Sequence, residues 1–134
     1  MASIINASPS NGIVQTADGS GVLKCQANGV TTNALAWVNF NGTTSPGTIR
    51  SAYNVGSVTK NGTGDYTVNF TNALTDTNYV VLSASEGGGS VGSPPYQRGN
   101  YPITSTSNVR LTFLTYNAGS FVDPTYCCAA IFGN

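Results

Sequence analysis

The sequence contains no histidine and very little charge, and both absences narrow the functions that it can have. Only 7% of its 134 residues are Asp, Glu, Lys or Arg, against about 25% in ordinary soluble domains. The formal net charge is zero, whereas nucleic-acid binding needs clustered Lys and Arg. Histidine is also the most versatile general base and metal ligand. We therefore expect no nucleic-acid partner, no cofactor and no enzymatic activity, and no metal-binding residues are nominated.

Long apolar runs are missing as well. No segment approaches the eighteen or so consecutive apolar residues that a membrane span requires, so we expect no membrane insertion. The N-terminus has neither the basic start nor the long apolar core of a secretory signal. The cysteines are odd in number, three in all, and lack the spacing of a disulfide framework. These features predict synthesis in a reducing cytoplasm.

Uncharged polar residues take the place of charge. Asn, Thr, Ser and Gly supply 62 of the 134 residues, while hydrophobic residues make up 40%. The length suits one domain with one core, and its surface is hydrated without being ionic. Because neutral proteins associate more readily than charged ones, this composition favours a subunit of an assembly.

Residues 34–85 carry the clearest strand pattern. Apolar Tyr66, Val68 and Phe70 alternate with polar Thr67 and Asn69, the period of a half-buried strand. Residues 49–55 predict a further strand, with Ile49, Tyr53 and Val55 on one face. The continuous apolar run 79–82 predicts a strand buried on both faces. The pairs Asn41-Gly42 and Asn61-Gly62 are expected to supply the positive φ angles of tight turns.

The remaining sequence completes an all-β prediction. The loop 86–102 is rich in Gly and Pro and is expected to be irregular and exposed. A strand is predicted over 109–116, and the closing run YCCAAIF must be a core strand or an intersubunit contact because it would aggregate if exposed. No segment has helical periodicity. We predict an antiparallel β-sandwich or jelly-roll-like domain over residues 34–134, preceded by an extended N-terminal arm over residues 1–33.

The arm has too few apolar residues to form its own core, so we expect it to lie on another surface. Its apolar residues come in pairs separated by turn signals: Ile4, Ile5, Ile13, Val14, Val22 and Leu23.

Several chemical motifs are present but lack their structural context. Gly87–Gly92 matches G-x-G-x-x-G, yet prolines follow where the phosphate-binding helix must begin. Two of the acidic residues Asp18, Asp65, Asp76, Glu86 and Asp123 could pair as in a glycosidase, but turn and surface roles are favoured, and Asp65 and Asp76 flank turns. The Cys127-Cys128 pair is too close for a zinc site and is expected to be buried.

The loop 86–102 offers a candidate binding surface in Tyr96, Arg98 and Tyr101. Exposed Tyr and Arg are the usual anchors of binding surfaces, and tyrosine rings stack on sugars. The alternative is an ordinary long loop packed against its neighbours.

Two segments resemble proteins of known type. Residues 34–43 (ALAWVNFNGT) and 49–70 (IRSAYNVGSVTKNGTGDYTVNF), followed by the turn LTDTNY, are similar to a module of tailed-bacteriophage proteins that are described as tail fibre or virion structural proteins. The opening INASPSNGIVQTADGSGVLKCQANGV resembles the N-terminal head of such proteins.

The resemblance implies a non-enzymatic virion protein, typically a homotrimer, displayed on the particle surface. The arm would then attach to other virion proteins of the capsid or tail, and the 86–102 loop would contact a host surface glycan. No shaft segment separates the two matching parts, which favours a short tail or head fibre. A capsid decoration protein that stabilises the phage head is the alternative, and a cellular carbohydrate-binding module or small glycan hydrolase is a more remote one.

Overall fold

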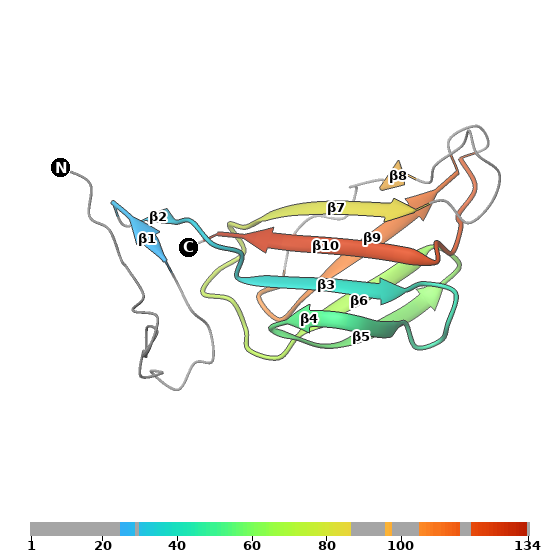
Figure 1. Ribbon diagram of the computed structural model, residues 1–134, viewed down its shortest axis with the longest axis horizontal. Helices are drawn as coiled ribbons and strands as arrows, with labels where there is room; N and C mark the ends of the chain where they lie inside the picture. Colours follow the sequence, from blue (N-terminus) through green and yellow to red (C-terminus); the bar gives the residue numbers. More distant parts are fainter. Residues whose placement is uncertain (1–24, 29, 87–95, 98–104, 116–118, 134) are drawn as a thin grey trace, which may run out of the picture.

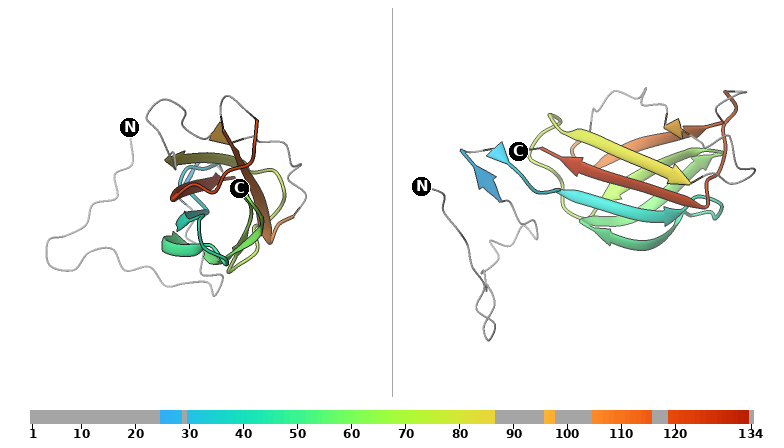
Figure 2. Two further views of the ribbon diagram at one scale, coloured as in Figure 1. Left: turned by 90° about the vertical axis from the view of Figure 1, so that its right-hand side faces the viewer. Right: turned by 45° about the horizontal axis from the view of Figure 1, so that its top comes forward.

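The structure is a computed structural model that describes residues 25–28, 30–86, 96–97, 105–115 and 119–133. Within these residues the chain is all-β, and two four-stranded antiparallel sheets form a sandwich (Figure 1). The end-on view in Figure 2 shows the two layers facing each other. The described part contains no helix, and therefore none long and apolar enough to cross a membrane. The predicted all-β sandwich is confirmed.

The strands divide between two sheets and a small hairpin. The front sheet has the order β4 (Thr48–Tyr53), β3 (Ala36–Asn41), β10 (Tyr126–Phe132), β7 (Val80–Glu86). The back sheet has the order β5 (Val55–Gly62), β6 (Asp65–Phe70), β9 (Asn108–Leu114), β8 (Tyr96–Gln97). The strands β1 (Gln26–Ala27) and β2 (Val30–Thr31) pair beside the end of the sandwich at which β3 begins and β10 ends (Figure 1).

The core lies between the two sheets and follows the predicted alternation. Tyr66 and Val68 of β6 are fully buried, while Thr67 and Asn69 point outward and are half-buried. The ring of Tyr66 lies edge-on to Phe40 of the front sheet, with 5.2 Å between ring centroids. The C-terminal run is confirmed as a core strand, since β10 lies between β3 and β7. Other fully buried core residues come from both layers: Ala36, Leu111, Phe113, Cys127 and Ile131.

The predicted strand over 49–55 is in fact two strands in different sheets. The chain passes from β4 to β5 at Asn54, which adopts a positive φ of 52°. The Asn54 side-chain amide donates to the carbonyl oxygens of Leu35 and Asn72 and so holds the crossing in place. A bulge places Arg50 as an extra residue between the Asn39–Ser51 and Phe40–Ile49 pairs. The predicted common face of Ile49 and Tyr53 is therefore wrong.

The strand predicted to be buried on both faces is also different from expectation. Tyr79 is buried, but Val80 and Leu82 are each 60% exposed. Val80 and Leu82 point to the outer face of the front sheet, while Val81 between them packs against the core. Within the part of the chain that the structure describes, no third layer covers the outer face of this sheet.

The Asn-Gly turns are built differently from the prediction. Neither Gly42 nor Gly62 has a positive φ; in the β5–β6 hairpin it is Gly64 that does, at 65°. Gly42 is needed for close approach instead, because a Cβ there would lie 2.6 Å from Tyr66 Oη and 2.7 Å from the Pro124 carbonyl oxygen.

Candidate functional site

The residues that the sequence nominated as binding or attachment sites fall largely outside the described part of the structure. Tyr96 begins β8, where its backbone pairs with Leu114 of β9. Arg98 and Tyr101 lie outside the described residues, as do all six nominated residues of the arm: Ile4, Ile5, Ile13, Val14, Val22 and Leu23. Their roles stay predictions. The described residues point to a different surface, the outer face of the front sheet.

The outer faces of the two sheets have unlike chemistry. Polar side chains of the back sheet bond to one another across strands. Asn69 Nδ2 donates to Ser57 Oγ and Thr59 Oγ1, at 3.1 Å each. Asn61 Nδ2 donates to Asp65 Oδ1 at 3.2 Å and to Thr67 Oγ1 at 2.9 Å. Such a surface satisfies its own hydrogen bonds and is well suited to face water.

The front sheet carries apolar side chains on the corresponding face. Trp37 of β3 pairs with Tyr53 of β4 on one side and with Ala130 of β10 on the other, and Ala130 in turn pairs with Leu82 of β7. These residues form one row across all four strands, and Phe132 and Val80 form a second pair beside it. We call this group the apolar patch: Tyr53, Trp37, Ala130, Leu82, Phe132 and Val80.

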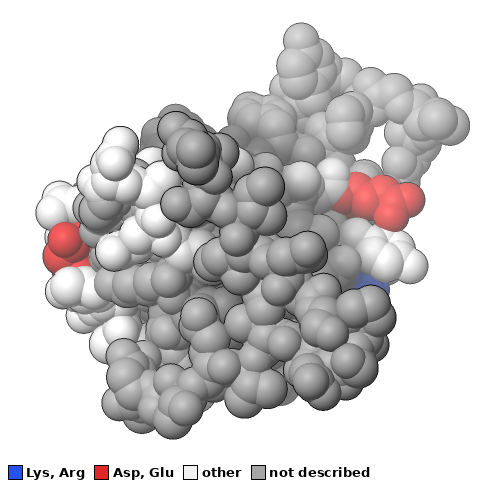
Figure 3. All heavy atoms as spheres, turned by 60° about the vertical axis from the view of Figure 1, so that its left-hand side comes forward, with Lys and Arg blue, Asp and Glu red and all other residues white. Residues whose placement is uncertain are grey.

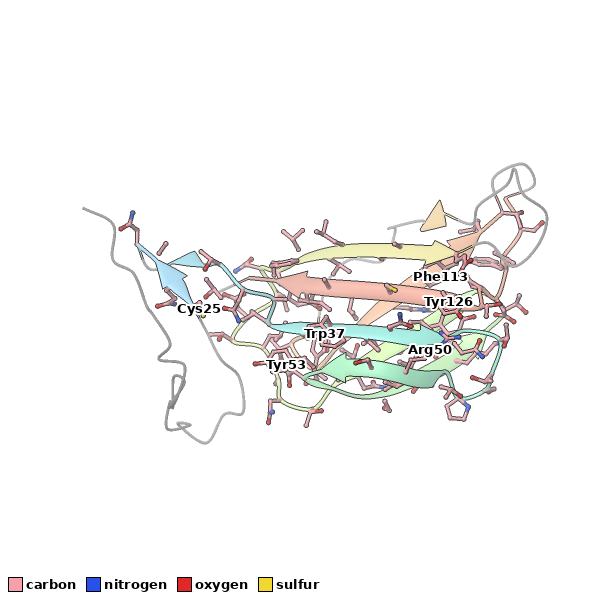
Figure 4. All side chains as sticks on the ribbon, in the orientation of Figure 1. Cys25, Trp37, Arg50, Tyr53, Phe113 and Tyr126 are labelled. Carbon is pink, nitrogen blue, oxygen red and sulfur yellow. The ribbon has the colours of Figure 1, made fainter. Side chains whose placement is uncertain are left out.

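The apolar patch includes most of the large hydrophobic side chains that the described structure leaves exposed. Trp37 is 38% exposed, and Val80 and Leu82 more so. Exposed apolar groups scattered singly are ordinary, whereas a contiguous group marks an interaction surface. Figure 4 shows Trp37 and Tyr53 side by side toward the end of the sandwich where β3 begins.

The opposite end of the same face is polar and contains its charged residues. The Arg50 guanidinium lies over the Tyr126 ring, 4.1 Å from the centroid. It also donates to the Thr125 carbonyl oxygen at 2.8 Å and to Asn39 Oδ1 at 3.4 Å. Glu86 is paired across strands with Tyr126. Arg50 and Glu86 are the only charged residues in the four front-sheet strands, so the face has no net charge.

Figure 3 shows the end of the molecule seen from the left of Figure 1. The described atoms on that side belong mainly to uncharged residues.

One ion pair joins β5 to the segment that precedes β10. Lys60 Nζ contacts Asp123 Oδ2 at 2.7 Å. Asp123 Oδ1 accepts from the Gly64 backbone N–H at 2.7 Å and from Tyr66 Oη at 2.6 Å. Burial alone raises the pKa of Asp123, but the bonds from Gly64, Lys60 and Tyr66 outweigh it and hold the pKa below its ordinary value. Burial raises the pKa of Tyr66, so this group stays a neutral donor.

The second ion pair lies on the outer face of the back sheet. Arg110 binds Asp65 through both carboxylate oxygens, and its Nε donates to Oδ1 at 2.8 Å. The hydrogen bond from Arg110 lowers the pKa of Asp65, against the opposite effect of burial. Asp65 thus has a surface role, as an ion-pair partner, and Asp76 has a turn role, since it accepts from the Asn78 N–H at 2.7 Å.

The described residues assemble no metal-binding group. Within them, no three or more His, Cys, Asp or Glu side chains come together in a way that could hold a metal ion. Cys127 is fully buried as expected, and burial raises the pKa of its thiol to about 12, so it is an unreactive core residue. Cys128 is half-buried on the outer face, and Cys25 is exposed.

Alternation in the sequence predicts only part of the apolar patch. The outward position of Trp37 follows from the pattern of β3, where Ala36, Val38 and Phe40 point inward. Its partner Tyr53 reaches that face only because of the bulge at Arg50.

Comparisons with known proteins support the fold. No protein-family model matches the chain, and no curated protein matches its sequence. Among solved structures, the chain is similar to the phiAB6 tailspike, which was crystallised with three-repeated oligosaccharides of the Acinetobacter baumannii surface polysaccharide. The TM-score is 0.51 at 14% identity, over 98% of this chain and 31% of the tailspike chain. The chain thus spans about a third of that tailspike, and the likeness is one of fold.

Proposed function

We propose that this chain is a non-enzymatic structural protein of a bacteriophage virion, displayed on the particle surface as part of a short tail or head fibre. It is made in the host cytoplasm and assembles into the virion as a homotrimer in contact with other virion proteins. The observation that carries the proposal is the neutral β-sandwich whose two outer faces differ, one saturated with its own hydrogen bonds and one apolar. A domain with one such apolar face is suited to bind another protein through it.

Two further observations support this function. A phage tailspike contains a region of similar fold, and residues 34–70 resemble a module of phage fibre proteins. The carboxylates of Asp65 and Asp123 are each held by a different cation, an arrangement suited to stabilising the fold. A glycosidase instead needs two carboxyl groups facing one substrate.

In this function, residues 1–33 attach the sandwich to the particle. An extended segment can add to a free sheet edge through backbone hydrogen bonds, which serve any partner with an open edge. The apolar pairs Ile4-Ile5, Ile13-Val14 and Val22-Leu23 then enter pockets of the partner.

Deletion of residues 1–24 tests the attachment role, because β1 and β2 begin beyond them. We expect the truncated chain to keep the circular-dichroism spectrum and unfolding midpoint of the full chain but to be missing from purified particles. Normal incorporation of the truncated chain would show that these residues are not the attachment segment.

The loop 86–102 is the proposed contact with a host surface glycan, through Tyr96, Arg98 and Tyr101. Replacing these three residues with Ala should reduce adsorption of particles to host cells without changing the amount of protein per particle. Adsorption at the wild-type rate would remove the loop from the proposal.

The location of the protein on the particle tests the function as a whole. Antibodies against the sandwich, imaged on intact particles by electron microscopy, should label fibres at the tail or head. Label spread evenly over the capsid shell would favour the alternative, a decoration protein that stabilises the head, for which the apolar face would be a capsid contact. A protein absent from particles would refute both.

A further inference from the structure

We infer that the outer surface of β3 and β4 is a binding platform for a neutral saccharide chain. We call it the aromatic platform, and its residues are Tyr53, Trp37, Ser51, Asn39 and Arg50. These residues differ from those of the loop 86–102 in the proposed function, and the inference does not depend on the protein being a virion component.

The two halves of the front sheet present different side chains outward. In β3 and β4 every outward side chain is aromatic or polar: Tyr53, Trp37, Ser51, Asn39, Asn41, Thr48 and Arg50. The aliphatic members of the apolar patch, Leu82 and Val80, lie on β7 at the opposite edge of the sheet. The centre of a protein contact is mainly apolar and has few charged groups, and the surface of β3 and β4 does not have this composition.

The polar groups of the aromatic platform keep free hydrogen-bonding capacity, unlike those of the back sheet. Asn39 Oδ1 accepts from Arg50 Nη1, whereas Asn39 Nδ2 has no partner within the described residues. The exposed hydroxyl of Ser51 has none there either. Arg50 donates to Asn39 and Thr125, which leaves further N–H groups of its guanidinium available. Covering these groups with an apolar surface would cost their hydration, so a polar ligand is favoured.

The aromatic rings provide an apolar contact beside these polar groups. Trp37 and Tyr53 are direct cross-strand neighbours and lie side by side on the surface (Figure 4). A sugar ring has C–H faces that stack on aromatic rings, and hydroxyl groups at its rim that need donors and acceptors. Asn39 and Ser51 form the next outward pair across the same two strands. Their free groups therefore lie where the hydroxyls of a stacked sugar would be.

The position of Tyr126 indicates the length of the ligand. Trp37 pairs with Ala130, and Tyr126 lies four residues from Ala130 along β10, or about 13 Å at the rise of a strand. The Arg50 guanidinium lies over the Tyr126 ring, so its free donors are at that end of the face (Figure 4). A single sugar ring is too short to reach from Trp37 to these donors, so the ligand is a chain of several sugars.

The charges of the face favour a neutral saccharide. Arg50 and Glu86 both adjoin Tyr126 and have opposite signs, so an acidic sugar would gain from one and lose from the other. Single-stranded nucleic acid also stacks on aromatic rings, but it needs a positively charged groove along its backbone, which this face does not offer. Binding should accordingly change little between about 50 and 500 mM salt.

Fluorescence of the full chain gives a direct test. Trp37 is the only tryptophan, so its emission reports on the aromatic platform alone. The probes are neutral oligosaccharides of glucose, mannose, galactose and N-acetylglucosamine. At least one series should change the Trp37 emission in a saturable way, and its longer members should bind more tightly than the monosaccharide.

Two substitutions test the aromatic platform, with binding of the same oligosaccharide measured by calorimetry. Trp37→Ala should raise the dissociation constant about tenfold, and Ser51→Ala, which removes one exposed hydroxyl, about threefold. The matched controls are Phe121→Ala, at an exposed aromatic residue outside the platform, and Ser57→Ala, at a serine of the back-sheet surface. Both controls should bind as wild type does, and circular dichroism confirms that each variant folds.

Three results would overturn the inference. Absence of binding by every probe at about 10 mM, an affinity too weak to be useful, would leave the rings without a saccharide. Binding that Trp37→Ala and Ser51→Ala do not weaken, or that the controls weaken equally, would place the saccharide site elsewhere. Trp37 emission that responds to protein concentration but to no sugar would make the surface a contact between proteins. Each of these results leaves the proposed place on the virion, which antibody labelling tests separately, unaffected.

Discussion

Removal of the Asp123 carboxylate should destabilise the sandwich far more than removal of a surface carboxylate. Asp123→Ala deletes the acceptor for the Gly64 N–H, for Tyr66 Oη and for Lys60 Nζ. Lys60 and Tyr66 each keep one bond, to the Gly42 carbonyl oxygen. Breaking a buried ion pair costs roughly 3–5 kcal/mol. The Lys60 and Asp123 side chains are 15% and 25% exposed, so partial screening reduces the expected cost to about 2–3 kcal/mol.

This loss is measurable by urea unfolding followed by circular dichroism at neutral pH. The transition midpoint should fall while its slope stays the same, and the melting temperature should drop by about 10 °C. Asp65→Ala is the matched control, because the partner Arg110 is 41% exposed and surface pairs contribute about 0.2–1 kcal/mol. If Asp123→Ala costs no more than Asp65→Ala, the view that the Asp123 network anchors residues 119–125 to the β5–β6 hairpin is wrong.

Three further changes probe the same fold. The pKa of Asp123 is lower in the folded chain than its unfolded value of about 3.9. The charged carboxylate therefore stabilises the fold fully above that pH, and this stabilisation is lost as pH falls through the folded pKa. The free energy of unfolding in urea, measured below about pH 4, should accordingly depend less on pH in Asp123→Asn than in wild type. Gly42→Ala places a methyl group against Tyr66 Oη and should cost about 1–3 kcal/mol, which thermal unfolding measures. Tyr79→Phe removes the hydroxyl that bonds the Ser105 and Asn108 carbonyl oxygens and should cost about 1 kcal/mol, and an unchanged melting temperature would contradict that role.

The site residues predicted from the sequence stay predictions, and the surface that the structure points to is a different one. The nominated side chains of the arm and loop are not among those that the structure describes, whereas the apolar patch was not foreseen. Its signal was divided between strands distant in sequence, with Trp37 in β3 and Leu82 in β7, and these meet only through β10. A run such as 79–82 has the same pattern whether one face or both faces of its sheet are covered.

Local alternation was enough to establish the class of the fold. Tyr66, Val68 and Phe70 point inward because side chains of a strand alternate between its two faces, and this holds wherever the strand lies. The absence of helical spacing and the closing apolar run are also local features. The all-β class and the core strand that they predict are both confirmed.

The order of strands in the sheets, and hence the surface, depended on contacts between distant segments. Lys60 and Asp123 are 63 residues apart in the chain, yet their ion pair holds one end of the sandwich. Leu82 lies on the outer face because its register places it beside Ala130, and Tyr53 lies beside Trp37 because of one extra residue at a bulge. No local pattern specifies such pairings, since each is selected by the free energy of packing the two sheets as a whole.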